Sequence, residues 1–331
     1  MSKIIRYNIS YYTSLKNYYY KNWIDRDPDY FDYRIKEIPE DQIDTQDNLI
    51  VVNDNDEIVG CQFVLPTKAL VQGIERNICW NNDTFIDEEY RGDLGAELVV
   101  YPSKGKLHFG AGLSQINLKI QKKLKTPFLG TSKEYVILNW KSPFTLLRSK
   151  IGPTYVPKIH TECINIDEYR FCRINNISQL TIPNKGYWFG VESDVEFIRD
   201  AHFIEKRFLS NFNQYHLFAH YNQDGVSDMY FVVRIIHRKG FPVLSVVDVR
   251  YNRNNLKALP IMLKAANKIA MKSGIPFTLF TTTINIDKSM YHKRLKINEC
   301  AVVTGPKKIN YNDVNSIIFT AADSDTDFQM K

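Results

Sequence analysis

The stretch from Ile78 to Leu124 restricts the fold of this chain most, because strand, loop and helix patterns follow one another closely within it. Residues 78–86 are apolar and aromatic with a threonine, which is typical of a strand, and residues 90–96 lead into a pattern of helical spacing. A helix that begins there directs free backbone N–H groups and the positive end of its dipole toward the loop. The stretch therefore predicts a strand, an anion-binding loop and a helix.

The loop resembles the acyl-CoA-binding core of the GNAT N-acyltransferase superfamily, which has Arg or Gln, two residues, Gly, one residue, and then Gly or Ala. Here Arg91 and Ala96 match, Leu94 stands at the position of the middle glycine, and Gly95 becomes the last glycine if one residue is deleted. Asp93 either brings a negative charge near the phosphate or caps the helix. The resemblance implies an α/β (α+β) fold with tandem GNAT-like domains, each a mixed, mostly antiparallel sheet flanked by helices.

The resemblance also implies the residues that hold acyl-CoA, the one cosubstrate expected, with no metal. In the family, the fourth strand separates from the fifth and the thioester lies between them. By position, this implies pantetheine contacts from Thr84, Phe85 and Ile86 and a hydrogen bond from Ser114. The expected pyrophosphate contacts are Arg91, Gly92, Asp93, Leu94, Gly95 and Ala96.

The general acid of the family has no counterpart here. Members often carry a tyrosine in the helix after the fifth strand that protonates the departing thiolate, and the matching position is Gln121. An amide cannot serve as an acid. We expect the thiol to leave with a proton from water or as the thiolate, since its free pKa is about 8.5.

Amide formation also requires a base, because an ammonium group has no lone pair with which to attack. Asp83, near the end of the predicted strand, is the first candidate, with Trp80 beside it as a substrate contact. The alternative is that Asp83 is a surface carboxylate on the opposite face. His108 on the next strand is the second candidate, and a hydrogen-bonded core histidine is the usual explanation for such a residue.

The second half of the chain repeats the architecture of the first without obvious sequence identity. We expect an acyl-CoA-binding domain over 1–150 and a degenerate copy over 160–320, with a boundary at the proline-rich residues 152–157. The expected strands of the first half are 3–8, 48–52, 57–65, 78–86, 108–112 and 133–139, with helices over 14–24 and 114–124. Those of the second are 169–174, 215–221, 229–237, 242–250 and 277–282, with helices over 195–209, 256–272 and 288–295.

The second copy lacks the phosphate loop, because residues 251–256 contain no glycine after its fourth strand. We therefore expect only the first half to bind coenzyme A and the second to supply the acceptor pocket. The candidate acceptor contacts are Trp188, His216, Asp248 and Arg250. For Asp248 and Arg250, which share one face of a strand, a structural ion pair is the alternative.

Composition excludes several other classes of protein. The net charge of +6 is modest and contains no Lys/Arg block, so no nucleic-acid partner is expected. The chain has no apolar run of the roughly 18 residues that a membrane span needs. Its five cysteines lack CxxC spacing, which argues against zinc and a disulfide scaffold and favours reduced core thiols in the cytoplasm. The tyrosines at 11, 12 and 18–20 are expected to pack a helix against its sheet, with stacking on a sugar or base as the alternative.

Within the superfamily, the overall arrangement is most similar to bacterial nucleotide-sugar N-acyltransferases. Those enzymes place a 3-hydroxybutanoyl or acetyl group on the amine of a dTDP-3-amino-3,6-dideoxyhexose for surface polysaccharides such as O-antigen. Two alternatives stay open: a tRNA-dependent aminoacyl transferase, which also has twin GNAT-like domains, and a non-catalytic GNAT-like interaction module. The amino sugar, the nucleotide, the acyl chain and the oligomeric state do not follow from the sequence.

Overall fold

The computed structural model describes the chain in separate ranges, which are 2–23, 30–35, 48–101, 108–111, 115–123, 125, 128–139, 157–181, 193–209, 215–238, 240–252, 254–304 and 317–323. The chain divides into two compact units, one of residues 1–131 and 298–317 and the other of 132–297 and 318–331. This division differs from the expected ranges 1–150 and 160–320. The reason is strand pairing, because residues 133–138 pair within the second unit and residues 300–304 pair within the first.

The first unit is built on a mixed sheet in the order β1-β2-β3-β4-β5-β14, in which β4 and β5 are parallel and the other neighbours are antiparallel. A two-residue turn joins β3 to β4, and its residues Gln72 and Gly73 both have positive φ, as a type I′ hairpin requires. The strands are β1 (Lys3–Arg6), β2 (Leu49–Val52), β3 (Ile58–Val71), β4 (Ile74–Ile86), β5 (His108–Ala111) and β14 (Lys293–Thr304), the last of which begins in the second unit.

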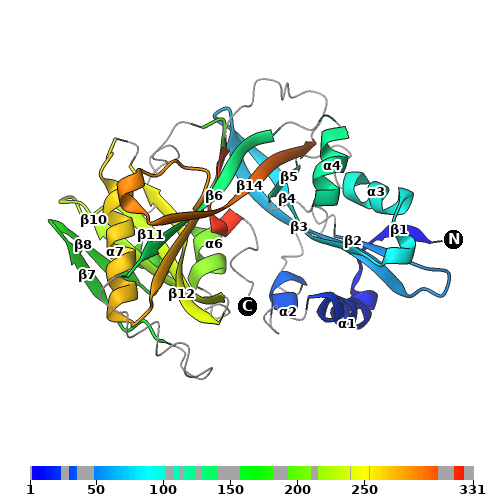
Figure 1. The fold of residues 1–331 in the computed structure, drawn as a ribbon, viewed down its shortest axis with the longest axis horizontal. Coiled ribbons are helices and arrows are strands. Elements are labelled where there is room, and N and C mark those ends of the chain that lie inside the picture. Colours follow the sequence, from blue (N-terminus) through cyan, green and yellow to red (C-terminus); the bar gives the residue numbers. More distant parts are fainter. Residues whose placement is uncertain are drawn as a thin grey trace. The chain divides into compact units, whose positions relative to one another are not determined.

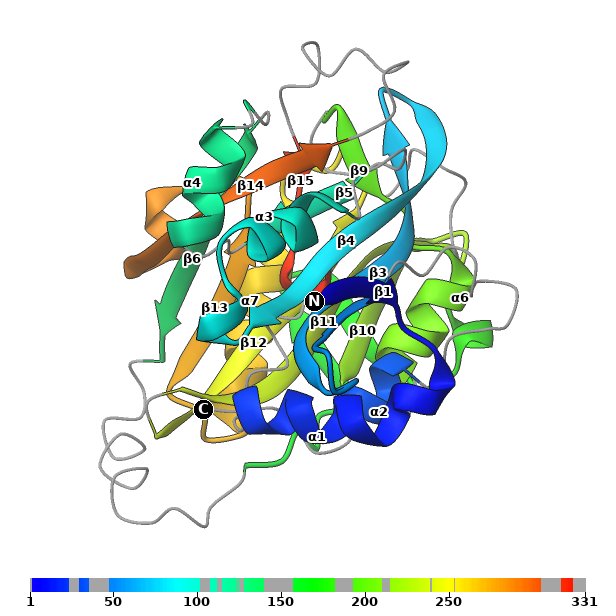
Figure 2. The ribbon, with the colours of Figure 1, turned by 90° about the vertical axis from the view of Figure 1, so that its right-hand side faces the viewer.

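Helices lie on both faces of this sheet, with α1 and α2 on one side of β3 and β4 and α3 on the other (Figure 1, Figure 2). On the first face, the buried ring of Tyr19 packs against Phe63 of β3. On the second, Leu98 of α3 packs against Leu49 and Val51 of β2. The helices are α1 (Tyr12–Asn22), α2 (Tyr30–Ile35), α3 (Asp93–Val100) and α4 (Gln115–Lys123), with short turns η1 (Ile9–Tyr11) and η3 (Glu88–Tyr90).

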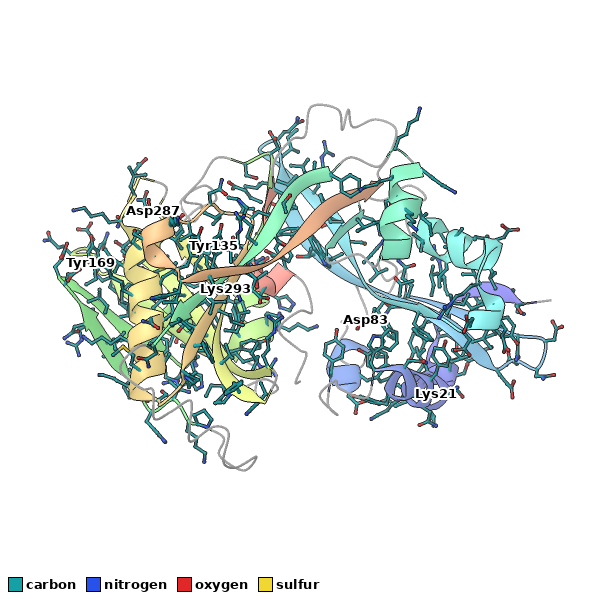
Figure 3. The ribbon with its side chains drawn as sticks, in the orientation of Figure 1. Lys21, Asp83, Tyr135, Tyr169, Asp287 and Lys293 are labelled. Carbon is teal, nitrogen blue, oxygen red and sulfur yellow. A yellow bond between two sulfur atoms is a disulfide. The ribbon has the colours of Figure 1, made fainter. Side chains whose placement is uncertain are left out.

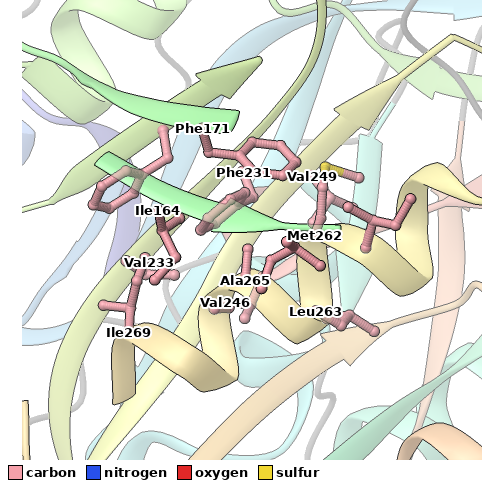
Figure 4. Close-up of a cluster of buried hydrophobic side chains, with 14 of the residues drawn as sticks. Ile164, Phe171, Phe231, Val233, Val246, Val249, Met262, Leu263, Ala265 and Ile269 are labelled. Atoms are coloured by element: carbon pink, nitrogen blue, oxygen red, sulfur yellow. The ribbon is translucent and has the colours of Figure 1, made fainter. Parts of the chain in front are cut away.

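The second unit contains a sheet in the order β6-β13-β12-β11-β10-β8-β7, in which β12 and β13 are the parallel pair. The apolar side of α7 (Ala258–Lys272) covers one face, where Met262, Ala265 and Ile269 pack against Phe231 and Val246 (Figure 4). The strands are β6 (Phe128–Leu138), β7 (Cys163–Ile166), β8 (Tyr169–Ile174), β10 (His216–Tyr221), β11 (Ser227–Arg238), β12 (Phe241–Tyr251) and β13 (Phe277–Thr282).

The predictions of two helices in the second half are wrong in part. Residues 195–209 form strand β9 (Val195–Phe197), helix α6 (Ala201–Ile204) and a π-helical turn η6 (Glu205–Leu209), because the Asp200 side chain caps a helix that starts only there. Residues 288–295 form a 3-10 turn η7 (Lys288–Met290) followed by the start of β14. The remaining short elements are η5 (Ile177–Gln179), β15 (Ile317–Ile318) and η9 (Ala321–Asp323).

The prediction that all cysteines are reduced is also wrong. Cys163 and Cys172 form a disulfide because they stand directly opposite each other in the β7–β8 hairpin. Cys61 and Cys79 are buried and belong to no disulfide. Within the described residues, no helix combines the length and apolar character needed to cross a bilayer.

The predicted architecture is confirmed in both units. Each contains a long antiparallel hairpin, β3–β4 or β11–β12, whose second strand runs parallel to a later strand, β5 or β13. In each, the connection between these parallel strands contains a helix, α3 or α7. The internal repeat is therefore one of topology.

Candidate active site

A β-bulge interrupts the hairpin of the first unit at Asp83. Cys61 pairs with Phe85 and Phe63 pairs with Asn82, so Asp83 and Thr84 together stand opposite the single residue Gln62. Asp83 has a φ of 40°, in the left-handed region that Asp tolerates better than most residues. Bulges redirect a side chain and end regular pairing, and they are frequent beside active sites.

The bulge turns Asp83 toward α1 and α2 (Figure 3). Two phenols from these helices meet its carboxylate. The Tyr19 hydroxyl donates to Oδ2 at 2.8 Å and the Tyr30 hydroxyl donates to the same atom at 3.4 Å. Both tyrosines are buried, whereas Asp83 is partly exposed. The expected alternative, a surface carboxylate on the other face, does not describe this arrangement.

Next to the bulge, the parallel strands β4 and β5 pair over only two residue pairs in the described part, Cys79 with His108 and Trp80 with Phe109. All four residues of β5, including Gly110 and Ala111, pair with β14 on its other edge. The two strands thus stop pairing just before Asp83. The ring of Trp80 is 1% exposed and stacks on Phe109 with centroids 6.2 Å apart, so it lies in the core at this junction.

The loop after β4 leads directly into α3. Gly92 precedes the helix with φ 99° and ψ −129°, a conformation that glycine adopts and other residues avoid. Ala96 makes the first helical hydrogen bond, to the Gly92 carbonyl at 3.0 Å, so the preceding amides have no acceptor within the helix. Asp93 is the first helical residue rather than the cap, which contradicts the capping role considered for it.

The remaining residues expected to bind acyl-CoA differ in exposure. Arg91 is exposed and donates from Nε to the Ile86 carbonyl at 3.2 Å. Leu94 and Ile86 pack around the apolar core beneath α3. Thr84, Gly92 and Asp93 are exposed, Phe85, Gly95 and Ala96 are partly buried, and Ser114 lies outside the described residues.

His108 and Gln121 are both fully buried. His108 Nδ1 lies 2.8 Å from Asn81 Oδ1. Asn81 pairs with Val64 and shares its face of the sheet, whereas the adjacent Phe63 lies on the other face, where it contacts Tyr19. His108, which contacts Asn81, therefore lies on the face away from the phenols that hold Asp83. Gln121 Nε2 donates to Asn117 Oδ1 at 3.3 Å within α4.

A thiol also lies on the Asp83 side of the sheet. Burial raises the pKa of Cys61 well above its usual value, and the carboxylates of Asp83 and Asp87 raise it further. Cys61 is therefore a neutral thiol near neutral pH. Because the thiolate is the nucleophilic form, the environment of Cys61 disfavours a covalent acyl-cysteine intermediate there.

In the second unit, the chain itself fills the corresponding position. Strands β12 and β13 pair from Val243–Phe277 to Val246–Phe280, after which Thr282 of β13 pairs with Thr320. The Phe319 carbonyl accepts hydrogen bonds from Thr282 Oγ1 at 2.8 Å and from the Thr283 amide at 3.2 Å. A segment from the end of the chain thus occupies the place where the parallel strands separate.

The same segment is anchored to a buried ionic network around Asp248 and Arg250, which are 0% and 1% exposed. Asp248 accepts hydrogen bonds from Arg250 Nη1 at 2.7 Å, Arg199 Nε at 3.1 Å, Thr320 Oγ1 at 2.8 Å and Tyr230 at 3.0 Å. Arg199 Nη2 also forms an ion pair with Asp323. Asp248 and Arg250 therefore form the structural ion pair that was the alternative to substrate contact.

The last two residues expected to contact the acceptor are His216 and Trp188. His216 is partly buried, and burial, aided by Arg173, lowers its pKa to about 4, so its imidazole is neutral near pH 7. Trp188 lies outside the described residues.

Comparison with known proteins identifies the fold and not the family. No protein-family model matches the chain. No curated protein matches it in sequence.

Solved structures, in contrast, match over most of the chain. Saccharomyces cerevisiae N-myristoyltransferase with bound myristoyl-CoA superposes with a TM-score of 0.56 at 12% identity, over 96% of this chain and 89% of that one. The chain has a tandem GNAT fold. An Enterococcus faecalis protein described as a probable N-acyltransferase and a GCN5-related N-acetyltransferase from Anabaena variabilis each give a TM-score of 0.56, at 11% and 13% identity, over 92% of this chain and 73% of theirs.

The sequence patterns did not predict several residues that shape these two sites within the tandem GNAT fold. Tyr19 belongs to a tyrosine cluster that was expected to pack against the sheet or to stack on a sugar or base, and Tyr30 had no signal of its own. Arg199 contacts partners 49 and 124 positions away, so no local pattern connects it with Asp248 and Asp323. A buried charge on an otherwise apolar strand, as at Asp248, was the one signal that could have indicated such a network.

Proposed function

We propose that this protein is an acyl-CoA-dependent N-acyltransferase whose first unit binds the acyl-CoA. The observation that carries the proposal is the contrast between the two topological repeats. In the first, β4 and β5 stop pairing beside a bulge with a partly exposed carboxylate, and a glycine-capped helix follows. In the second, residues 319–323 fill that position and both charges of the strand are buried. Bound myristoyl-CoA in a protein of the same fold supports the proposal.

In the proposed reaction, the acceptor amine attacks the thioester carbonyl directly. Asp83 accepts the proton that the amine must lose, through direct contact or one water, so that a lone pair is available. The C–N bond forms and the C–S bond breaks, and coenzyme A leaves as the thiolate or takes a proton from water. Asp83 is preferred to His108 as the base because its carboxylate is partly exposed, whereas His108 is fully buried on the other face.

For the acceptor, we propose the amino group of a nucleotide-linked amino sugar, with an acetyl or 3-hydroxybutanoyl group as the acyl chain. This narrower proposal rests on the resemblance in the sequence. A panel of acyl-CoAs crossed with dTDP-linked and UDP-linked amino sugars, followed by thiol release, tests it. Turnover only with other amines, such as peptide N-termini, would replace the sugar while leaving the acyl-CoA proposal intact.

Coenzyme A binding is the first test of the broader proposal. Calorimetry with coenzyme A and acetyl-CoA should give saturable binding with one site per chain, because residues 319–323 fill the corresponding position in the second repeat. An absence of binding at millimolar ligand would refute the proposal and favour the non-catalytic module or the tRNA-dependent transferase. Two sites per chain would refute the assignment to the first unit alone.

Two glycines at the start of α3 form a matched pair that locates the site. Gly92→Ala forces a side chain into the left-handed region, at a cost of about 1–3 kcal/mol, and should weaken coenzyme A binding about tenfold. Gly95→Ala places a Cβ 3.7 Å from Ile86 Cγ2, an ordinary contact, and removes a helix-interior glycine. It should therefore retain affinity. Equal effects of the two substitutions on the dissociation constant would place the phosphates elsewhere.

A further inference from the structure

The tyrosines around the Asp83 carboxylate form a defined hydrogen-bonding environment rather than general packing. Tyr19 belongs to α1 and Tyr30 to α2, and both hydroxyls reach the same oxygen, Oδ2, as described above. The Tyr19 ring is itself held on several sides, stacked on Trp23 with centroids 4.6 Å apart and edge-on to Phe63 at 5.4 Å. Its hydroxyl therefore has little freedom to point elsewhere.

We propose that Tyr19 and Tyr30 are positioning residues that keep the Asp83 carboxylate ionised and hold it in one orientation for the acceptor amine, an inference that rests on the proposed function. A carboxylate that accepts hydrogen bonds is stabilised in its charged form relative to its protonated form. The two phenols also restrict the rotation of the carboxyl group, because both donate to the same oxygen, Oδ2. The bulge directs the carboxylate and the phenols hold it there.

Other titratable groups lie near Asp83, and their titration must be distinguished from the effect of the two phenols on its carboxylate. Tyr18 of α1 donates to Asp87 Oδ1 at 3.0 Å, and burial, with Asp87 among the further causes, raises its pKa far above the usual value. It therefore stays a neutral phenol. Among the described residues, the titratable groups on the elements around Asp83 include Tyr18 and Tyr19 of α1, Tyr30 of α2, the ion pair of Lys16 in α1 with Asp32 in α2, Cys61 of β3, and Asp87 and Arg91 after β4.

The test compares Tyr19→Phe, Tyr30→Phe and the double variant with wild type in the pH dependence of kcat/KM. Removing a donor disfavours the charged carboxylate, so the acid limb of the profile, where the base becomes protonated, should move to higher pH. A hydrogen bond to a charged group corresponds to a shift of about one pH unit for Tyr19→Phe. Tyr30→Phe, whose hydrogen bond is longer, should give a smaller shift, and the double variant the largest.

Tyr18→Phe is the matched control, because it removes a tyrosine donor from the same helix that is bonded to Asp87 instead. Its profile should coincide with wild type. A second readout is the titration midpoint of the Asp83 side-chain carboxyl carbon, followed by NMR in the protein without ligands. Circular dichroism establishes that each variant is folded.

The outcomes separate this inference from the proposed function. If the acid limb and the carboxyl midpoint do not move in Tyr19→Phe and the double variant, or move equally in Tyr18→Phe, the inference is overturned. If the midpoint moves but wild type turns over no acyl-CoA, the proposed function fails and the effect of the phenols on Asp83 stands.

Discussion

Asp83→Asn should lower turnover by roughly 10²–10⁴-fold, the contribution that a general base makes to proton transfer. The amide retains an oxygen that can accept from Tyr19 and Tyr30, so the surrounding hydrogen bonds persist in part. It cannot take a proton from the amine near neutral pH. Because the role proposed for Asp83 is at the reacting nitrogen rather than at the phosphates, the dissociation constant of coenzyme A should stay close to wild type. Thiol release under saturating acyl-CoA measures the loss.

Asp87→Asn is the control for this prediction, since Asp87 is also a carboxylate held by a tyrosine at the end of the same strand. It should retain turnover near that of wild type. The acid limb of the pH profile should disappear in Asp83→Asn and persist in Asp87→Asn. Near-normal turnover of a folded Asp83→Asn variant would remove this residue from the mechanism and return His108 to consideration.

Arg199→Met should destabilise the protein by about 3–5 kcal/mol near neutral pH, the usual result of removing one partner of a buried ion pair. Arg199 is bonded to both Asp248 and Asp323. Its loss leaves Asp248 with Arg250 and neutral donors, and leaves the buried carboxylate of Asp323 without this cation. Because the pair with Asp323 anchors the segment 319–323, that segment should detach first. Urea unfolding measures the free energy, and hydrogen exchange of residues 318–323 reports the detachment.

The pH dependence of this loss follows from the network. Burial alone would raise the pKa of Asp248, but Arg199, Arg250 and the hydrogen bonds outweigh it, so the pKa lies below its ordinary value. A carboxyl group whose folded pKa is depressed contributes stability above its unfolded pKa of about 3.9, and that stability is lost as the pH falls through the folded pKa. The difference between wild type and Arg199→Met should therefore narrow below about pH 4.

A surface pair provides the control for this prediction. Arg173→Ala removes a guanidinium that lies 3.8 Å from Glu162, whose side chain is 70% exposed. Such a pair contributes about 0–1 kcal/mol, since water and salt screen it. If Arg173→Ala and Arg199→Met cost the same, the buried network does not stabilise the second unit as described.

The elements that could be predicted are those in which a repeating pattern and a turn signal coincide. Strands 169–174 and 277–282 match the structure residue for residue, and the hairpin β11–β12 and helix α7 begin and end within two residues of expectation. In contrast, residues 288–295 carry a helix-like pattern but turn into β14, whose end pairs with β5. Pairing with a strand distant in sequence outweighed local preference there.

The orientation of Asp83 shows why the site could not be predicted in full. In a regular strand, alternation assigns each residue to one face of the sheet. For Asp83, counting from Asn82 gives one face and counting from Phe85 gives the other, because the bulge inserts one residue between them. The partners that complete the site, Tyr19 and Tyr30, come from helices 64 and 53 positions away in the chain.

By itself, the sequence determined the twofold topology, the glycine at the start of α3 and the candidate carboxylate, because these depend on periodicity and on single residues with special backbone or chemical properties. The tertiary structure alone decided that Asp83 is held by phenols, that Asp248 and Arg250 are neutralised internally, and that residues 319–323 fill one of two equivalent positions. Such outcomes depend on contacts between distant segments, and they follow from the cost of leaving a buried polar group without a partner rather than from any local pattern.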